Sequence, residues 1–196
     1  MQNKKALLVV DIQNDFCPGG ALGVSEGDQI IPLVNKYVQL FLDKQLPVFI
    51  TRDWHPNETK HFKEFGGPWP IHCVQNTKGG EFHPDFIIPE KAIILSKGTD
   101  PQSDGYSAFD AFDSNNTSFL EVLEQLGIDE LYICGIATDY CVRFSSLDAL
   151  KKGFKVNILI DAIKGVDKED SKRTLDEIAA KNAKMKMFDE VEKELI

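Results

Sequence analysis

Cys141 occupies a position at which a cysteine can act as a nucleophile. It ends the segment Gly-Ile-Ala-Thr-Asp-Tyr-Cys (135–141), where apolar residues typical of a buried strand give way to a predicted helix. Backbone N–H groups and the positive end of a helix dipole favour a thiolate at such a turn and can hold an oxyanion. Because most cysteines are simply buried apolar side chains, this interpretation needs support from the rest of the chain.

Three further reactive side chains stand at the ends of predicted strands. Asp11, Asp53 and Lys97 each follow a short apolar run, and open α/β sheets bind their ligands at the carboxyl ends of strands. Taken singly, each is more often a cap, a turn residue or a surface group than a reactive residue. Together with a thiol they form a reactive set, because an ammonium lowers the pKa of a thiol and a carboxylate can take its proton and later deliver it to a leaving group.

A second group of residues has the composition of a metal site. Asp53 and His55 are separated by one residue, and His72 follows within Trp-Pro-Ile-His-Cys. Such carboxylate and imidazole ligands suit zinc, iron or manganese. Isolated histidines are usually surface or core polar groups, but three of the four histidines of this chain lie between residues 55 and 72. His61 and Glu64 compete for the place of a fourth ligand.

These residues are connected by an alternation of strands and helices. The predicted strands are 6–10, 47–51, 92–95, 131–134, 156–160 and 185–188, and the predicted helices are about 28–44, 117–126, 138–152 and 168–181. Asp28 is expected to cap the first helix, and the fourth is expected to begin after Asp167. Continuous apolar strands between amphipathic helices indicate a parallel sheet covered on both faces. We therefore predict a three-layer α/β/α fold with a six-stranded, mostly parallel sheet.

Two long segments show no helical or strand periodicity. Residues 54–85 are rich in Pro, Gly, His and aromatic side chains, and residues 98–116 carry Tyr106, Phe109 and Phe112. Loops of this length in a compact domain are usually functional, so we expect the first to form a metal and substrate loop and the second a lid or pocket wall. With 196 residues and no repeats, the whole chain (1–196) is expected to form one domain.

Composition restricts the partners and the compartment. The hydrophobic fraction of 42% and the charged fraction of 27% are typical of a globular protein, and the net charge is −9. Since the sequence has no dense cluster of Lys and Arg, we expect neither nucleic acid nor an anionic membrane as partner. The four cysteines lack CxxC spacing and no apolar run is long enough for a signal peptide or a membrane span, so we expect free thiols and a cytoplasmic protein. The sequence leaves open whether the chain forms a homo-oligomer.

Five short motifs resemble a known family. They are the segments 9–17, 51–55, 69–73, 96–98 and 135–142. In these motifs, which span most of the chain, the sequence resembles the nicotinamidases of the isochorismatase-like cysteine hydrolase superfamily. The acid, lysine and cysteine motifs are shared by amidases of the superfamily in general, whereas the loop with Trp-Pro-Ile-His-Cys is particular to nicotinamidases.

The resemblance implies a role for each residue of the reactive set. Asp11 is expected to accept a proton, Lys97 to provide the cation, and Cys141 to form a thioester with the nicotinoyl group. The main-chain N–H groups of Ala137 and Cys141 are expected to form the oxyanion hole. The family also implies a cis peptide bond between Ile136 and Ala137.

The resemblance also assigns the metal and the substrate pocket. Asp53, His55 and His72 are expected to bind one divalent ion, with zinc favoured over iron and manganese, and that ion to contact the pyridine nitrogen of nicotinamide. His61 serves as a ligand in some relatives and a glutamate near position 64 in others, so both remain candidates. The residues expected to wall the ring pocket are Phe16, Trp69 and Tyr106, although aromatic side chains more often pack in a core.

The predicted reaction is the conversion of nicotinamide to nicotinate and ammonia, which feeds NAD salvage. One alternative is a related amidase for another small carboxamide or ureide. An ether hydrolase of the same fold is disfavoured, because that chemistry does not need the complete set of Asp11, Lys97 and Cys141. A non-catalytic metal-binding or interaction module is a third alternative, and it predicts an ordinary thiol at Cys141.

Overall fold

A single parallel sheet forms the centre of the molecule. The computed structural model describes residues 4–195. The strands are β1 (Lys5–Val10), β2 (Val48–Asp53), β3 (Ile93–Lys97), β4 (Glu130–Ile136), β5 (Lys155–Lys164) and β6 (Lys184–Lys186), in the order β3-β2-β1-β4-β5-β6. Every neighbouring pair is parallel. The predicted six-stranded sheet is therefore confirmed, and it is entirely rather than mostly parallel.

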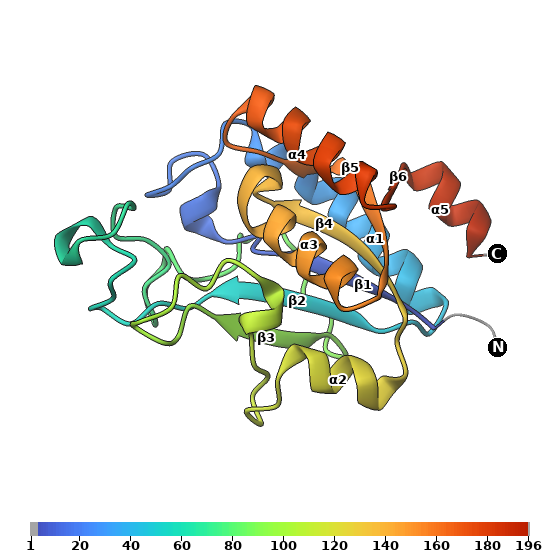
Figure 1. The fold of residues 1–196 in the computed structure, drawn as a ribbon, viewed down its shortest axis with the longest axis horizontal. Coiled ribbons are helices and arrows are strands. Elements are labelled where there is room, and N and C mark those ends of the chain that lie inside the picture. The colour runs from blue at the N-terminus through green and yellow to red at the C-terminus, as the bar shows by residue number, and fades with distance from the viewer. Residues whose placement is uncertain (1–3, 196) are drawn as a thin grey trace.

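Helices cover both faces of this sheet (Figure 1). They are α1 (Ile31–Asp43), α2 (Phe119–Leu126), α3 (Arg143–Lys151), α4 (Lys168–Ala180) and α5 (Phe188–Glu194). Buried side chains of α1 and α5 share one apolar cluster with Leu7 and Val9 of β1. Those of α2, α3 and α4 share a second cluster with Leu8 and Val10. Because successive side chains of a strand point to opposite faces, the alternation along β1 fills both layers and confirms the α/β/α arrangement.

Two of the predicted helix boundaries were wrong. The first helix begins with a 3₁₀ turn, Gly27–Ile30, and Ile30 rather than Asp28 occupies the N-cap of α1. Pro32 lies at the start of α1, where its fixed φ suits the first helical turn. The predicted helix 138–152 is divided into a π-helical turn, Thr138–Val142, and α3. The expected start of the fourth helix is confirmed, since the carboxylate of Asp167 accepts from the first backbone N–H groups of α4.

The last helix was not predicted. The apolar run 185–188 gives only the short strand β6, and α5 begins at its end with Phe188. With seven residues, α5 is too short to show a clear helical period. Packing holds it in place, because the ring of Phe188 lies edge-on against Tyr37 of α1 with centroids 5.0 Å apart.

The two long irregular segments are ordered by a few contacts rather than by regular structure. Segment 54–85 contains one 3₁₀ turn, Lys63–Phe65, and an isolated bridge joins His55 to Val74. Segment 98–116 folds back so that Phe112 forms an isolated bridge with Ser96 of β3. Both segments therefore begin at the carboxyl ends of strands, on the left of Figure 1. Among residues 4–195, no helix is long and apolar enough to cross a bilayer, and the four cysteines are free, as expected.

The packing of α2 on the sheet predicts a large loss of stability on truncation. Phe119 is fully buried and its ring meets Phe49 of β2 with centroids 5.1 Å apart. We expect Phe119→Ala to lower the free energy of unfolding by about 3–5 kcal/mol, because the substitution leaves a cavity. Urea denaturation measures this change. Ile87→Ala is the matched control, since Ile87 is 69% exposed and its truncation should cost less than about 0.5 kcal/mol; equal losses in the two variants would contradict the packing argument.

Candidate active site

A buried lysine connects the residues predicted to react. The side chain of Lys97, the last residue of β3, is fully buried. Its Nζ lies 2.9 Å from Asp11 Oδ2 and 3.4 Å from the sulfur of Cys141, and it donates a short hydrogen bond to Asp53 Oδ1. The ammonium therefore donates to Asp53 and to the sulfur and forms an ion pair with Asp11. The structure thus brings together residues from the ends of four strands.

The pKa values of the two carboxylates beside Lys97 are shifted in opposite directions. Burial alone would lower the pKa of Lys97, but Asp11 and Asp53 hold it well above its usual value. Burial acts to raise the pKa of Asp53, yet Lys97 and then His55 bring it well below the usual range. Burial raises the pKa of Asp11, and Lys97 only partly offsets that effect. Such a separation assigns acid and base roles, so Asp53 is the permanent anion and Asp11 the group suited to take a proton.

The thiol of Cys141 is protonated at neutral pH in this arrangement. Burial raises its pKa well above the usual value; Lys97 acts in the opposite direction, and the charges of Asp11 and Asp53 raise the pKa further. Burial thus opposes the thiolate that the start of a helix favours. Asp11 Oδ2 accepts no well-directed hydrogen bond among the described residues, so it is available to receive the thiol proton.

The turn that carries Cys141 is shaped by its glycine and its helix start. Gly135 has φ +114°, and a Cβ at this residue would lie 2.1 Å from the carbonyl oxygen of Val10. Only glycine therefore lets β4 approach β1 closely just before Asp11. The peptide bond between Ile136 and Ala137 is cis, as the resemblance implies. The backbone then enters the π-helical turn, where N–H groups of the first turn lack acceptors within the helix.

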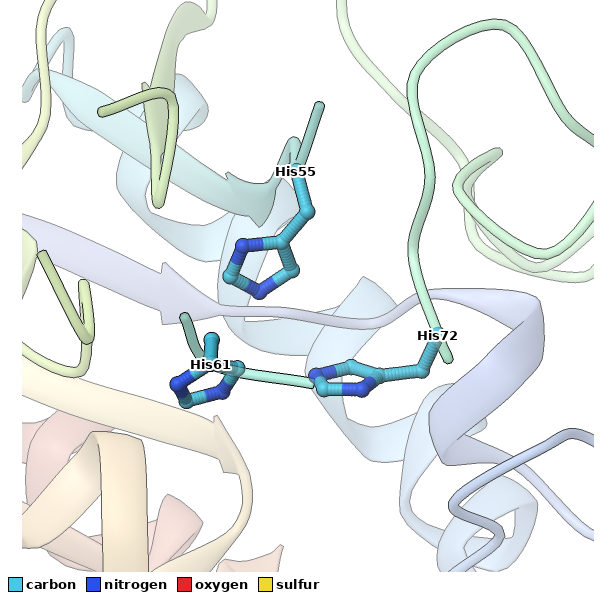
Figure 2. Close-up of side chains that lie close together, drawn as sticks. All are labelled: His55, His61 and His72. Carbon is cyan, nitrogen blue, oxygen red and sulfur yellow. The ribbon is translucent and has the colours of Figure 1, made fainter. Parts of the chain in front are cut away.

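Three imidazole rings lie close together beside Lys97 and Cys141. Figure 2 shows His55, His61 and His72 around a common space, and one ligand nitrogen from each lies within 4.8 Å of the other two. Each Nδ1 has an outer partner: Gly98 O at 3.0 Å, Asp104 Oδ1 at 3.4 Å and Pro70 O at 2.8 Å, respectively. Partners of this kind orient metal-binding histidines in other proteins.

The donor set fits a divalent metal ion. His55 Nε2 is buried and has no hydrogen-bond partner among the described residues, which is costly unless another group completes it. Burial, followed by the other two histidines, lowers the pKa of His61 to about 4, and burial lowers the pKa of His72. Both rings are therefore neutral at pH 7, which is the form that binds metal.

Asp53 belongs to both groups, whereas Glu64 belongs to neither. While Oδ1 of Asp53 faces Lys97, Oδ2 lies 3.6 Å from His55 Nε2 and 3.9 Å from His72 Nε2. Glu64 is exposed on its 3₁₀ turn and is not part of the histidine group. Of the two candidates for the fourth ligand, only His61 lies beside His55 and His72 in the described structure.

The aromatic residues predicted to wall a ring pocket do line one. Phe16, Trp69 and Tyr106 share a pocket with Cys141, and the indole N–H of Trp69 donates to the Tyr106 hydroxyl at 2.7 Å. The pocket is also lined by four residues that were not predicted, Leu22, Val24, Tyr140 and Val166. Tyr140 stands next to Cys141 in the sequence, which was a signal for it. The rest come from loops without any such signal.

Two polar residues that position the site were also missed. Gln13 is fully buried, and its side-chain amide donates to the carbonyl of Asp53 at 2.8 Å and accepts from the N–H of Asp53 at 2.8 Å. Asp15 accepts from the N–H of Cys73 at 2.7 Å and from that of Ala21 at 3.1 Å. Gln13 therefore fixes the backbone of Asp53, and Asp15 ties the wall that contains Phe16 to the segment that contains His72.

Known proteins are similar to this chain in sequence and in fold. The family model described as the isochorismatase domain matches residues 5–187. The nicotinamidase of Escherichia coli is 40% identical over 91% of this chain and 92% of its own length. The pyrazinamidase of Pyrococcus horikoshii, solved in complex with zinc, is 49% identical with a TM-score of 0.88, covering 94% of this chain and 99% of its own. PnC1 from L. infantum, solved in complex with nicotinate, is 32% identical with a TM-score of 0.82, covering 94% and 93%.

The chain therefore belongs to the isochorismatase family of α/β hydrolases. Within that family, the curated relatives that match it at 36–40% identity are named nicotinamidases, one of them nicotinamidase/pyrazinamidase.

The raised pKa of Cys141 predicts how its alkylation depends on pH. With a pKa well above 9, the thiolate fraction should grow about tenfold per pH unit up to at least pH 9. In the metal-free protein, the rate of Cys141 modification by iodoacetamide, followed by peptide mass spectrometry, should therefore rise without a plateau below pH 9. Lys97→Met should slow the reaction further, because the cation that lowers this pKa is lost. A plateau at or below pH 8 would contradict the assignment.

The position of His61 predicts a difference between two single variants in metal binding. His61→Ala should weaken binding of Zn²⁺ by at least about 10–100-fold, a loss seen even when groups behind the ligands are removed. Glu64→Ala should bind like the wild type, because Glu64 is exposed and outside the histidine group. Competition with a chromophoric chelator measures both affinities. The reverse order of the two variants would make Glu64 the ligand.

Proposed function

We propose that the chain is a cysteine amidohydrolase that converts nicotinamide to nicotinate and ammonia with the help of a bound divalent metal ion. The observation that carries this proposal is the contact of Lys97 with Asp11, Asp53 and Cys141 beside a group of three histidines at an aromatic pocket. The nicotinamidase relatives and the nicotinate complex of a neighbour support this substrate. The product nicotinate feeds NAD salvage.

The pocket orients a flat ring over Cys141. Phe16, Trp69 and Tyr106 provide aromatic walls, and the hydrogen bond between Trp69 and Tyr106 fixes the orientation of two of them. Asp53, His55, His61 and His72 would hold the metal ion, for which zinc is favoured because a neighbour was solved with zinc. When bound, that ion supplies a Lewis acid for the pyridine nitrogen.

The acylation step uses the proton relation between Asp11 and Cys141. Asp11 takes the thiol proton, and the sulfur of Cys141 attacks the carboxamide carbon to form a tetrahedral intermediate. The N–H groups of Ala137 and Cys141 donate to its oxyanion, and such donors contribute about 2.7–4 kcal/mol each in other enzymes. Asp11 then gives the proton to the leaving nitrogen, ammonia departs, and the nicotinoyl thioester remains. Lys97 stays protonated throughout and stabilises the charge on sulfur and on the carboxylates.

Hydrolysis of the thioester repeats the same proton transfers in the opposite direction. Asp11, ionised again after ammonia leaves, takes a proton from water as the water attacks the thioester carbon. The oxyanion returns to the same two N–H groups, and collapse of the intermediate expels the sulfur of Cys141. The thiol regains its proton and nicotinate leaves the pocket. One carboxylate thus acts as general base and then as general acid in each half of the reaction.

Ammonia release tests the proposal. The wild type with Zn²⁺ should release ammonia from nicotinamide, as measured with a coupled glutamate dehydrogenase assay. Cys141→Ala should reduce turnover to the background rate, and Asp11→Asn should lower kcat by about 10²–10⁴-fold, the usual contribution of a general base. Cys17→Ala is the matched control, because Cys17 is buried but outside the pocket.

The same assay separates nicotinamide from other substrates. Nicotinamide should show a higher kcat/KM than an aliphatic carboxamide or a ureide, because only an aromatic ring uses the walls of the pocket. An inert wild type, or full turnover by Cys141→Ala, would refute the mechanism. A higher kcat/KM for the ureide would keep the mechanism and reject the substrate.

A further inference from the structure

A second cavity lies at the end of the sheet opposite to Cys141. Its volume is about 1140 Å³, and residues at the starts of β1, β4, β5 and β6 line it. The carboxyl-terminal ends of α1 and α5 border it, on the right of Figure 1. The proposed amidase reaction takes place at the carboxyl ends of the strands and uses no residue of this cavity.

Strand register places charged residues side by side on its floor. Lys5 of β1 pairs with Glu130 of β4, and Glu130 pairs with Lys155 of β5. In the next row, Asn157 pairs with Lys184 of β6. Since side chains alternate along a strand, Lys155 and Asn157 share one face of β5, the face of Leu159, which packs in the cluster of α1 and α5.

The charge of the cavity is opposite to that of the protein. Six lysines line it: Lys4, Lys5, Lys44, Lys155, Lys181 and Lys184. The acidic lining residues are Glu130 and Glu194, in a chain with 31 acidic and 22 basic residues. A concave surface lined by one sign of charge concentrates ions of the other sign. This cavity therefore attracts anions, although the protein as a whole is acidic.

Both carboxylates of the cavity already have partners within the fold. Glu194 forms an ion pair with Lys186 and accepts from the hydroxyl of Tyr132 at 3.0 Å. Glu130 accepts from the side chain of Asn157 at 2.9 Å. Lys186 compensates Glu194, whereas Glu130 keeps its charge between Lys5 and Lys155, so the six lysines retain an excess of positive charge.

Structural roles account for four of the lysines but not for the other two. Lys4 donates to the carbonyl of Leu126 at the end of α2, and Lys5 lies over the ring of Tyr132. Lys44 and Lys181 occupy the C-caps of α1 and α4, where a cation stabilises the helix end.

Lys155 and Lys184 begin strands, where no helix end needs a cation. Both are exposed, and neither forms a salt bridge within the described part of the chain. Two adjacent strands of the floor therefore present exposed ammonium groups that no helix end requires, with Glu130 opposite Lys155 in the register.

We propose that this cavity binds a small molecule that carries a chain of phosphates. Lys155 and Lys184 hold the phosphate oxygens, and the exposed ammonium of Lys181, at the C-cap of α4, adds a third positive charge, since an ammonium is a good point-charge partner for phosphate. The apolar lining residues Leu46 and Phe154 form a surface for an organic group attached to the phosphates. A nucleoside triphosphate and an inorganic polyphosphate share the required chemistry, and they differ in whether they use that surface.

Isothermal titration calorimetry with tripolyphosphate and with ATP, without Mg²⁺, tests the proposal. The zinc-loaded wild type should bind at least one of them with a Kd below about 1 mM at low salt, and binding should weaken as salt is added. The triple variant Lys155→Gln, Lys181→Gln, Lys184→Gln should raise the Kd by about tenfold or more, because the partners of the phosphates are lost. Tighter binding of ATP than of tripolyphosphate would mean that the apolar surface takes part, and equal binding would mean that phosphates alone are recognised.

A second triple variant separates a site from a general effect of charge. Lys36→Gln, Lys91→Gln, Lys172→Gln removes the same charge from exposed lysines outside the cavity, and it should leave the Kd within about twofold. Binding of neither probe by the wild type would overturn the proposal. Equal weakening by the two triple variants would overturn it as well, because net charge would then explain the binding. Failure of this site would leave the amidase proposal untouched, since the two share no residue.

Discussion

The ion-paired position of Lys97 is the interaction on which the candidate site depends. A lysine without access to water is strongly disfavoured unless anions surround it, and Asp11 and Asp53 supply two. In turn, the buried cation lets two carboxylates lie close together without solvent, and lets one of them remain charged while the other is open to protonation. Removing Lys97 would leave the two carboxylates in the core without a cation, so their close approach depends on this one side chain.

The sheet topology explains why these residues meet. Asp11, Asp53 and Lys97 follow or end β1, β2 and β3, which are adjacent and parallel, and Asp53 lies directly opposite Lys97 in the register. The turn that carries Cys141 follows β4, on the other side of β1. The four chemical groups thus come from four neighbouring strands. No long-range loop has to find its place for the reactive set to form, whereas the histidines depend on loop contacts such as that between His55 and Gly98.

Sequence patterns predicted the parts of the molecule that follow periodic rules. Short apolar runs marked six strands, and strand ends pointed to Asp11, Asp53 and Lys97 because parallel topology gives those positions a common edge. The patterns did not reveal α5, which is held by the contact of Phe188 with Tyr37, nor the choice between His61 and Glu64, which depends on how an irregular loop folds. They also did not show that burial raises the pKa of Cys141, because burial is a property of the packed structure. Gln13 was missed because its function lies in bonds to the backbone of Asp53.

Asp53 faces Lys97 with one oxygen and the histidines with the other, and this has a thermodynamic consequence. A cation bound by the histidines would also attract the carboxylate of Asp53. It would thereby offset the negative charge that raises the pKa of Cys141. Ion binding and release of the thiol proton must then favour one another, and by linkage each changes the equilibrium of the other by the same factor. A shared carboxylate thus makes the ion a cofactor for the sulfur as well as for the ring. Loss of the metal ion would therefore affect both the thiol of Cys141 and the binding of the ring.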